Sequence, residues 1–122
     1  MLSKSVEGTP SEEMPSGRGR TIHLIDGSVG AKHIDVHVNE LNPGMGPGVV
    51  HYHTAAENVY YVLDGEGKVT HSGGELTVRQ GDIVFIPPRE VHSLTNVGTG
   101  TLRLIEIYAP GGADFVEAPD KL

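Results

Sequence analysis

The sequence predicts an all-β domain of the sandwich or barrel class, and two observations carry that prediction. Seventeen glycines and eight prolines among 122 residues lie between short runs rich in β-branched and aromatic residues, which is typical of strands joined by frequent tight turns. These runs alternate apolar and polar residues, and no helical period of any length interrupts them. The length allows one hydrophobic core and therefore one domain.

Composition also excludes several classes of partner. The net charge of −7 disfavours nucleic acid and anionic membranes, because both attract basic surfaces. No apolar run approaches the roughly 20 residues that cross a bilayer, and the N-terminus has no apolar signal region. We therefore expect no nucleic-acid or membrane partner and a cytoplasmic location. The absence of cysteine excludes disulfides and thiolate chemistry.

Three segments are expected along the chain. Residues 1–19 are polar and broken by glycine and proline, which predicts a flexible N-terminal arm. Residues 20–110 contain the strand patterns and form the barrel. Residues 111–122 are again polar and turn-rich, which predicts a C-terminal tail with Phe115 and Val116 as possible anchors.

Strands are expected in the barrel segment wherever apolar and polar residues alternate between turn signals. A tight turn at 72–74 predicts a hairpin, and Pro87 and Pro88 should end a strand because proline cannot donate to a sheet. Phe85, in a run that is apolar on both faces, is expected to pack in the core. The strands predicted by these patterns cover residues 21–25, 33–39, 49–53, 58–63, 68–71, 75–79, 83–86, 91–96 and 101–108.

His51 and His53 are the strongest candidates for function. They are separated by one residue, so a strand projects both side chains to the same face. Two imidazoles placed in this way can both reach a metal ion about 2 Å away. The alternative is a pair of surface histidines without function. His92 favours the metal site, because it begins a later strand that could lie opposite and supply a third imidazole.

These histidines lie in two motifs that resemble those of the cupin superfamily. The first motif, G(X)5HXH(X)3,4E(X)6G, is matched by His51, His53 and Gly65, and the second, G(X)5PXG(X)2H(X)3N, by Gly81, Pro87, His92 and Asn96. The resemblance covers residues 20–110. It implies a jelly-roll barrel, also called a double-stranded β-helix, with a metal ion held by the three histidines.

Two glycines of these motifs are replaced. Met45 stands at the first glycine, flanked by glycines on both sides, so the loop before His51 is shifted or remodelled. Arg89 stands at the glycine of the second motif. Its cation could meet an anionic substrate at the mouth of the barrel, or it could be a solvated loop residue.

The family's glutamate ligand is also displaced. Counting six residues back from Gly65 places Asn58 at the glutamate position, whereas the shorter count forward from His53 gives Glu57. Side-chain alternation favours Asn58 on the inward face, since Glu57 lies on the opposite face unless the strand bulges. Both remain candidates for a fourth ligand.

Two further residues are candidates for catalysis. Tyr60 shares a face with Asn58 and could line the pocket, or it could fill the core. His37 could act as an acid or base beside the substrate, or it could be a partly exposed strand histidine.

The resemblance implies one divalent metal ion, with Fe, Mn, Ni and Zn all compatible with this ligand set. A shell of neutral ligands leaves the ion its full charge and favours a small anionic substrate. We favour a dioxygenase-type oxidoreductase. The alternatives are an isomerase, epimerase or decarboxylase, or a binding module without catalysis. A homodimer is expected, because small cupins commonly pair and exposed sheet edges favour self-association.

Overall fold

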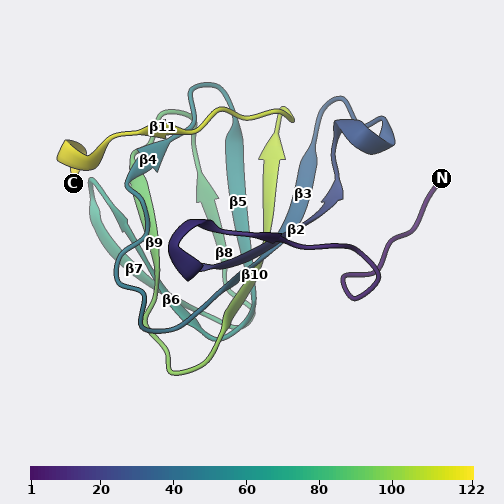
Figure 1. Cartoon of the computed structure of the whole chain (residues 1–122). Helices are drawn as coiled ribbons and strands as arrows, with labels where there is room; N and C mark the ends of the chain where they lie inside the picture. Colours follow the sequence, from purple (N-terminus) through teal and green to yellow (C-terminus); the bar gives the residue numbers. More distant parts are fainter.

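The computed structural model describes residues 1–122 and consists of two antiparallel sheets that face each other (Figure 1). This arrangement confirms the predicted all-β jelly-roll barrel. Only short 3-10 turns, η1 (Pro15–Gly17), η2 (Gly27–Val29) and η3 (Pro119–Lys121), interrupt the strands. No helix has the length and apolar character needed to cross a membrane.

Each sheet combines strands from distant parts of the chain. The larger sheet has the order β1 (Glu12–Glu13), β2 (Gly19–Ile25), β3 (Asp35–Leu41), β10 (Leu102–Ala109), β5 (Glu57–Asp64) and β8 (Ile83–Ile86). The smaller sheet has the order β11 (Val116–Glu117), β4 (His51–Tyr52), β9 (His92–Asn96), β6 (Glu66–His71) and β7 (Gly74–Arg79).

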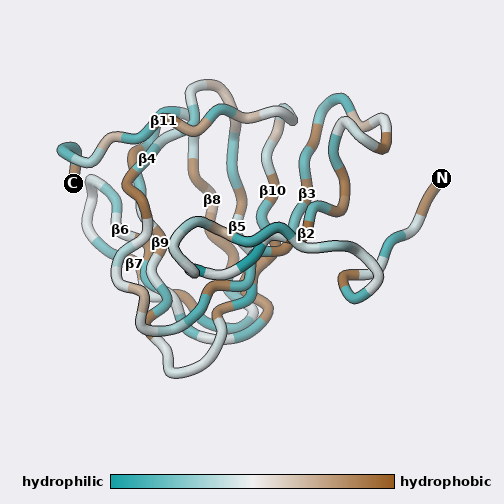
Figure 2. Tube along the Cα trace, viewed as in Figure 1, coloured by the Kyte–Doolittle hydropathy of each residue, from teal (hydrophilic) through white to brown (hydrophobic).

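The hydrophobic core fills one end of the space between the sheets. Alternate residues of β5 and β10 point inward, and valines of β6 and β7 meet them from the smaller sheet. Hydrophobic segments accordingly lie along the strands in Figure 2. The buried cluster consists of Tyr60, Val62, Val69, Val78, Val84, Ile86, Leu102 and Leu104. This packing anchors the inward faces of β5 and β10, whose next inward residues form the site.

Phe85 does not belong to this core, so the prediction that it packs there is wrong. Its exposed fraction is 59 % and that of Ile83 is 69 %. Strand β8 is the edge of the larger sheet, and its alternation sends Val84 and Ile86 inward and the other two residues outward. The apolar residues on both faces of β8 therefore indicate that the outer face of the larger sheet is apolar as well as its inner face.

Backbone geometry explains why two motif positions favour glycine. Gly65 has φ +89°, and a Cβ there would lie 2.6 Å from the carbonyl oxygen of Thr101. Arg89, at the other position, has φ +69°, in the left-handed region that glycine enters without strain. The Arg89 side chain is exposed and its backbone N–H donates to the carbonyl of His53. The loop therefore has a left-handed residue at the motif's glycine position without the glycine.

Strand β3 presents polar side chains to the interior. It pairs with β10 so that His37 lies opposite Glu106. His37 is buried and Asn39 is partly buried on this inward face, whereas Val36 and Val38 lie on the outer face. The apolar alternation in this strand thus faces away from the barrel interior.

Candidate metal centre

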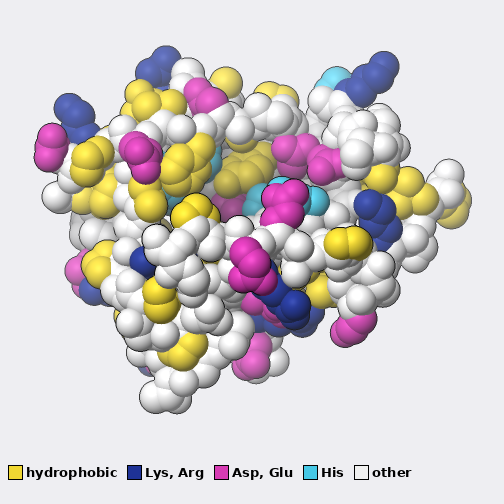
Figure 3. Space-filling model, viewed as in Figure 1, with side chains coloured by type: hydrophobic (Ala, Val, Ile, Leu, Met, Phe, Trp, Pro, Cys, Tyr) yellow, Lys and Arg dark blue, Asp and Glu magenta, His cyan; other side chains and the backbone are white.

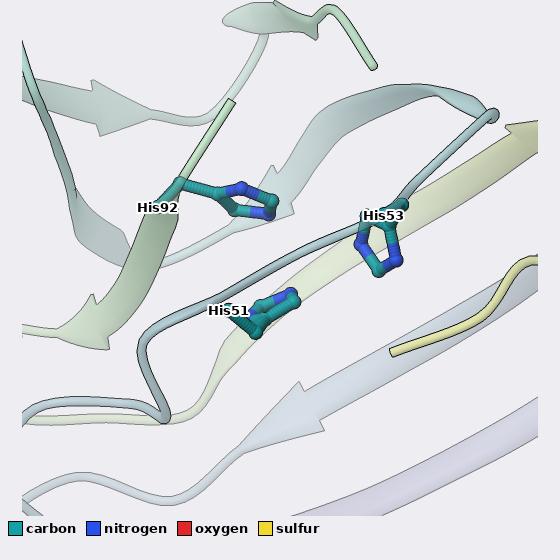
Figure 4. Close-up of side chains that lie close together, drawn as sticks. All are labelled: His51, His53 and His92. Carbon is teal, nitrogen blue, oxygen red and sulfur yellow. The ribbon is translucent and has the colours of Figure 1, made fainter. Parts of the chain in front are cut away.

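The three predicted histidines meet between the sheets. His51 lies in β4, His53 follows it directly, and His92 begins β9 as the cross-strand neighbour of His51. Their rings face a common space (Figure 4), and one ring nitrogen from each lies within 4.8 Å of the others. All three side chains are buried. Such a group of imidazoles has the composition and spacing of a metal site.

Each ring is held in a tautomer that can bind a metal ion through Nε2. The Nδ1 atoms of His51, His53 and His92 lie 2.8, 2.6 and 2.8 Å from the backbone carbonyls of Val49, Asp114 and Glu90. A carbonyl only accepts, so each Nδ1 carries the proton and each Nε2 keeps a lone pair. Hydrogen bonds of this kind orient metal-binding histidines and increase their basicity.

The environment also favours the neutral form of His51 and of His92. Burial lowers the pKa of His51 to about 4, and burial likewise lowers the pKa of His92. The Nε2 atoms of His53 and His92 are buried and have no hydrogen-bond partner in the protein. Since unpaired buried polar atoms are costly, the three residues fit a divalent ion that would accept their lone pairs.

A segment predicted as tail contributes to this site. The Phe115 ring stacks on His51 with 3.9 Å between ring centroids and 14° between planes. The Asp114 carboxylate accepts hydrogen bonds from the backbone N–H and the hydroxyl of Thr54, while its carbonyl holds His53. We define residues 113–117 as the C-terminal strap. Sequence reasoning noted Phe115 only as an anchor, because nothing local indicates what it covers.

The two candidates for the fourth ligand lie on opposite faces of β5. Glu57 is exposed, whereas Asn58 is fully buried. The Tyr60 ring, two residues along the same face as Asn58, lies edge-on to His92, and Tyr108, the cross-strand neighbour of Asn58, contacts His53. The structure therefore buries Asn58 on the inward face of β5, next to two tyrosines that contact the histidines, and leaves Glu57 at the surface.

A buried carboxylate that sequence reasoning missed lies beside Asn58. Glu106 accepts hydrogen bonds at 2.8 Å from both His37 Nε2 and Asn39 Nδ2, and at 3.1 Å from Asn58 Nδ2. Burial alone would raise the pKa of this carboxyl, but the hydrogen bonds from His37 and Asn58 outweigh burial and hold the pKa below its usual value. Glu106 is therefore an anion inside the barrel.

The sequence does contain a signal for Glu106. It shares the inward parity of Leu102 and Leu104 in β10, so alternation alone would have placed a charge in the interior.

A cavity of about 360 Å³ opens beside the histidines, within the size range of small-ligand sites. Figure 3 shows a hollow in this face of the molecule, bordered by hydrophobic, acidic and histidine side chains. Its lining includes Arg18, His51, Tyr60, Glu106, Tyr108 and Phe115. Tyr60 is thus a cavity residue. His37 does not line the cavity, but it contacts two residues that do, Glu106 and Tyr108.

Two phenols give the cavity hydroxyl groups that stay protonated. Burial raises the pKa of Tyr60 and of Tyr108, and the negative charge of Glu106 raises both further. At neutral pH these side chains are hydrogen-bond donors rather than bases. The remaining charges in the lining are Arg18 and Glu117. Arg18 donates to the carbonyls of Met45 and Gly46 at 2.9 Å each.

A two-sheet barrel that gathers three buried imidazoles between its sheets has the architecture of a small cupin. The family model described as "Cupin domain" matches residues 37–108. Because this match spans more than half of the 122 residues, the chain belongs to the cupin family.

The chain is also similar to individual proteins. The chain is 31 % identical over 114 residues to the oxalate-binding protein of Thermotoga maritima, covering 88 % of this chain and 92 % of that one. It is 33 % identical over 57 residues to an uncharacterized protein of Methanocaldococcus jannaschii, covering 47 % of this chain and only 46 % of that protein. The solved polyketide cyclase RemF of Streptomyces resistomycificus has 22 % identity and a TM-score of 0.83, covers 97 % and 85 % of the two chains, and shows the fold alone.

Proposed function

We propose that this cupin is a metal-dependent enzyme acting on a small organic anion. His51, His53 and His92 would hold one divalent ion through Nε2, and Asn58 would add its amide oxygen. The observation that carries the proposal is that the only buried side-chain polar atoms without a partner are His53 Nε2, His92 Nε2 and Asn58 Oδ1. All three belong to the proposed ligand set, and unpaired buried atoms of this kind call for a ligand.

The ligand set defines the class of substrate. Four neutral ligands leave a bound divalent ion its full charge, which polarises an oxygen-rich anion and supports oxygenase chemistry. The cavity would orient the anion, with the protonated hydroxyl of Tyr60 donating a hydrogen bond to it. Dioxygenase-type oxidation is the first activity to test, followed by isomerase, epimerase and decarboxylase activity.

A second candidate is anion binding without catalysis. Glu106, the carboxylate beside Asn58, is already occupied by three hydrogen-bond donors, and both cavity phenols are held protonated. The cavity therefore offers few groups that could act as a base. The relative from Thermotoga maritima is named an oxalate-binding protein, which favours a small dicarboxylate as the first ligand for this alternative.

Metal content tests the proposal first. Protein reconstituted anaerobically with Fe, Mn, Ni or Zn should hold about one ion per chain, and His51→Ala should hold almost none. The matched control is His33→Ala, which removes an exposed histidine and should leave the metal content unchanged. Failure of all four metals to bind stoichiometrically would refute the site.

Activity then separates the two candidates. Oxygen consumption with enolic and catecholic substrates, lost in His51→Ala, would support an oxygenase. Binding of oxalate by calorimetry to the metal-loaded protein, with no turnover of any tested anion, would support the binding function instead.

A further inference from the structure

The amide of Asn58 is fixed in one orientation by acceptors on one side. Its nitrogen donates to Glu106 Oε2 at 3.1 Å and to the carbonyl of Ile107 at 3.0 Å. Both partners can only accept when Glu106 is ionised, so the NH2 group must face them. Asn58 Oδ1 consequently points away from Glu106 and Ile107, and it is buried without a hydrogen-bond partner.

Glu106 is itself held rigidly. His37 and Asn39 of β3 both donate to its Oε1 at 2.8 Å, while its Oε2 accepts from Asn58 on β5. The carboxylate sits on β10, between the two strands that supply these donors. Its occupied lone pairs leave little capacity for a role as a base.

We propose that Glu106 is the positioning residue of the metal centre, which turns the oxygen of Asn58 toward the ion and places an anion just outside a neutral ligand shell. This inference rests on the proposed function, because it assumes that His51, His53 and His92 bind a metal. It gives a role to the buried His37–Glu106–Asn58 hydrogen bonds. The carboxylate found in the usual cupin shell is thereby moved one layer outward, from β5 to β10.

Exchange of Glu106 for glutamine should reverse the amide of Asn58. The amide oxygen of the introduced side chain would turn to the two donors on β3, and its NH2 group would then face Asn58. To accept from that group, Asn58 would turn its own oxygen away from the ion, opposed only by the carbonyl of Ile107. Mutation of a residue that hydrogen-bonds to a metal ligand typically lowers metal affinity by about 10- to 100-fold. We expect Glu106→Gln to lower the affinity by a factor of that size.

The test measures Mn²⁺ affinity by calorimetry and the visible spectrum of the Co²⁺-loaded protein, which reports the coordination of the ion. Glu106→Gln should weaken Mn²⁺ binding and alter the Co²⁺ spectrum. Glu40→Gln is the matched control, because it removes a carboxylate that accepts from Arg20 and Arg103 outside the histidine cluster. That variant should keep the parent affinity and spectrum even where its thermal stability falls.

A paired exchange distinguishes positioning from general destabilisation. The paired variant, Asn58→Asp with Glu106→Gln, moves the carboxylate from β10 to β5. The introduced amide on β10 can then donate a hydrogen bond to this carboxylate. Mn²⁺ affinity should then recover to within about threefold of the parent, as coupled residues do in a double-mutant cycle. This paired variant also carries the test if Glu106→Gln alone fails to fold.

The outcomes separate this inference from the proposed function. If the parent protein binds no metal, both are wrong. If the parent binds metal and His51→Ala does not, the site stands, and unchanged affinity and spectrum in Glu106→Gln would then refute the positioning role. Failure of the paired variant to recover affinity would also refute it, because Glu106 would then act by a route other than Asn58.

Discussion

At the scale of single residues, the histidine cluster combines neutral rings with fixed tautomers. Three backbone carbonyls accept from the Nδ1 atoms, and burial lowers the pKa of His51 and His92. Burial stabilises the neutral form that binds metal and opposes the protonated form. The same burial that prepares the site therefore makes the metal-free protein sensitive to acid.

We expect the free energy of unfolding of the metal-free protein to fall as the pH is lowered from about 6.5 to about 4. Unfolded histidines take up protons near pH 6.5, whereas folded His51 resists protonation until about pH 4, so the unfolded state binds more protons in this window. Below about pH 4.5, protonation of Glu106 in the unfolded state adds a further loss, because its folded pKa is lowered. Urea unfolding with a chelator at pH 7.5 and pH 5 measures the effect.

Two variants identify the source of this acid sensitivity. His51→Asn should reduce the difference between the two pH values, whereas His33→Asn, at an exposed position, should leave it unchanged. Equal stability of the parent at both pH values would show that burial does not govern the protonation of these rings.

At the scale of elements, the C-terminal strap contacts and orients the residues of the candidate metal site. It supplies the ring that stacks on His51, the carbonyl that holds His53 and the carboxylate that binds Thr54. Strand β11 within it pairs with β4, which carries His51. The strap thus fixes the positions of two proposed ligands from outside the barrel.

Phe115→Ala should therefore weaken metal binding. Loss of the stacked ring frees His51 to rotate, and we expect about a tenfold lower Mn²⁺ affinity with a stability loss of about 0.5–1.5 kcal/mol, since the Phe115 side chain is 54 % exposed. Calorimetry and thermal unfolding measure these two effects. Phe85→Ala is the matched control for the Mn²⁺ affinity, since this is the chain's other phenylalanine and its exposed fraction of 59 % is close to the 54 % of Phe115. A Phe115→Ala protein with parent affinity would show that the strap only covers the site.

The sequence predicted the parts of the site that depend on alternation along one strand. The face shared by His51 and His53, and the opposite faces of Glu57 and Asn58, follow from period two alone. The inward position of Glu106 was predictable by the same rule. The contacts of Asp114 and Phe115 were not, because they join a segment without regular pattern to β4 across the tertiary fold. The prediction that Phe85 is buried was wrong because alternation does not show which of two apolar faces is the inner one.

At the scale of the whole molecule, the outer face of the larger sheet is apolar. Cross-strand neighbours form the row Ile105, Tyr61 and Ile83, and a second row contains Ile107, Val59 and Phe85. The exposed fraction is 40 % for Tyr61 and higher for Ile83 and Phe85. Contiguous exposed apolar side chains of this kind are typical of association surfaces.

We expect this face to pair two copies of the chain as a homodimer. Phe85→Lys together with Ile83→Lys places charges on both rows and should raise the dimer dissociation constant by at least roughly 100-fold, because each lysine must be desolvated in a closed interface. Sedimentation equilibrium at micromolar concentration measures the mass of the parent and the variant. A parent protein that sediments as a monomer would contradict this prediction.

The hydrogen bond between His37 and Glu106 joins residues 69 positions apart, and this separation has a kinetic consequence. Strands β3 and β10 pair although most of the barrel sequence separates them. Folds dominated by contacts of such long sequence separation refold in roughly milliseconds to seconds. His51 and His92 lie on strands that are distant in the sequence and meet only in the paired sheet, so we expect an ion to bind only the completed barrel and to stabilise it by mass action. Metal uptake during refolding would then report the last step of assembly.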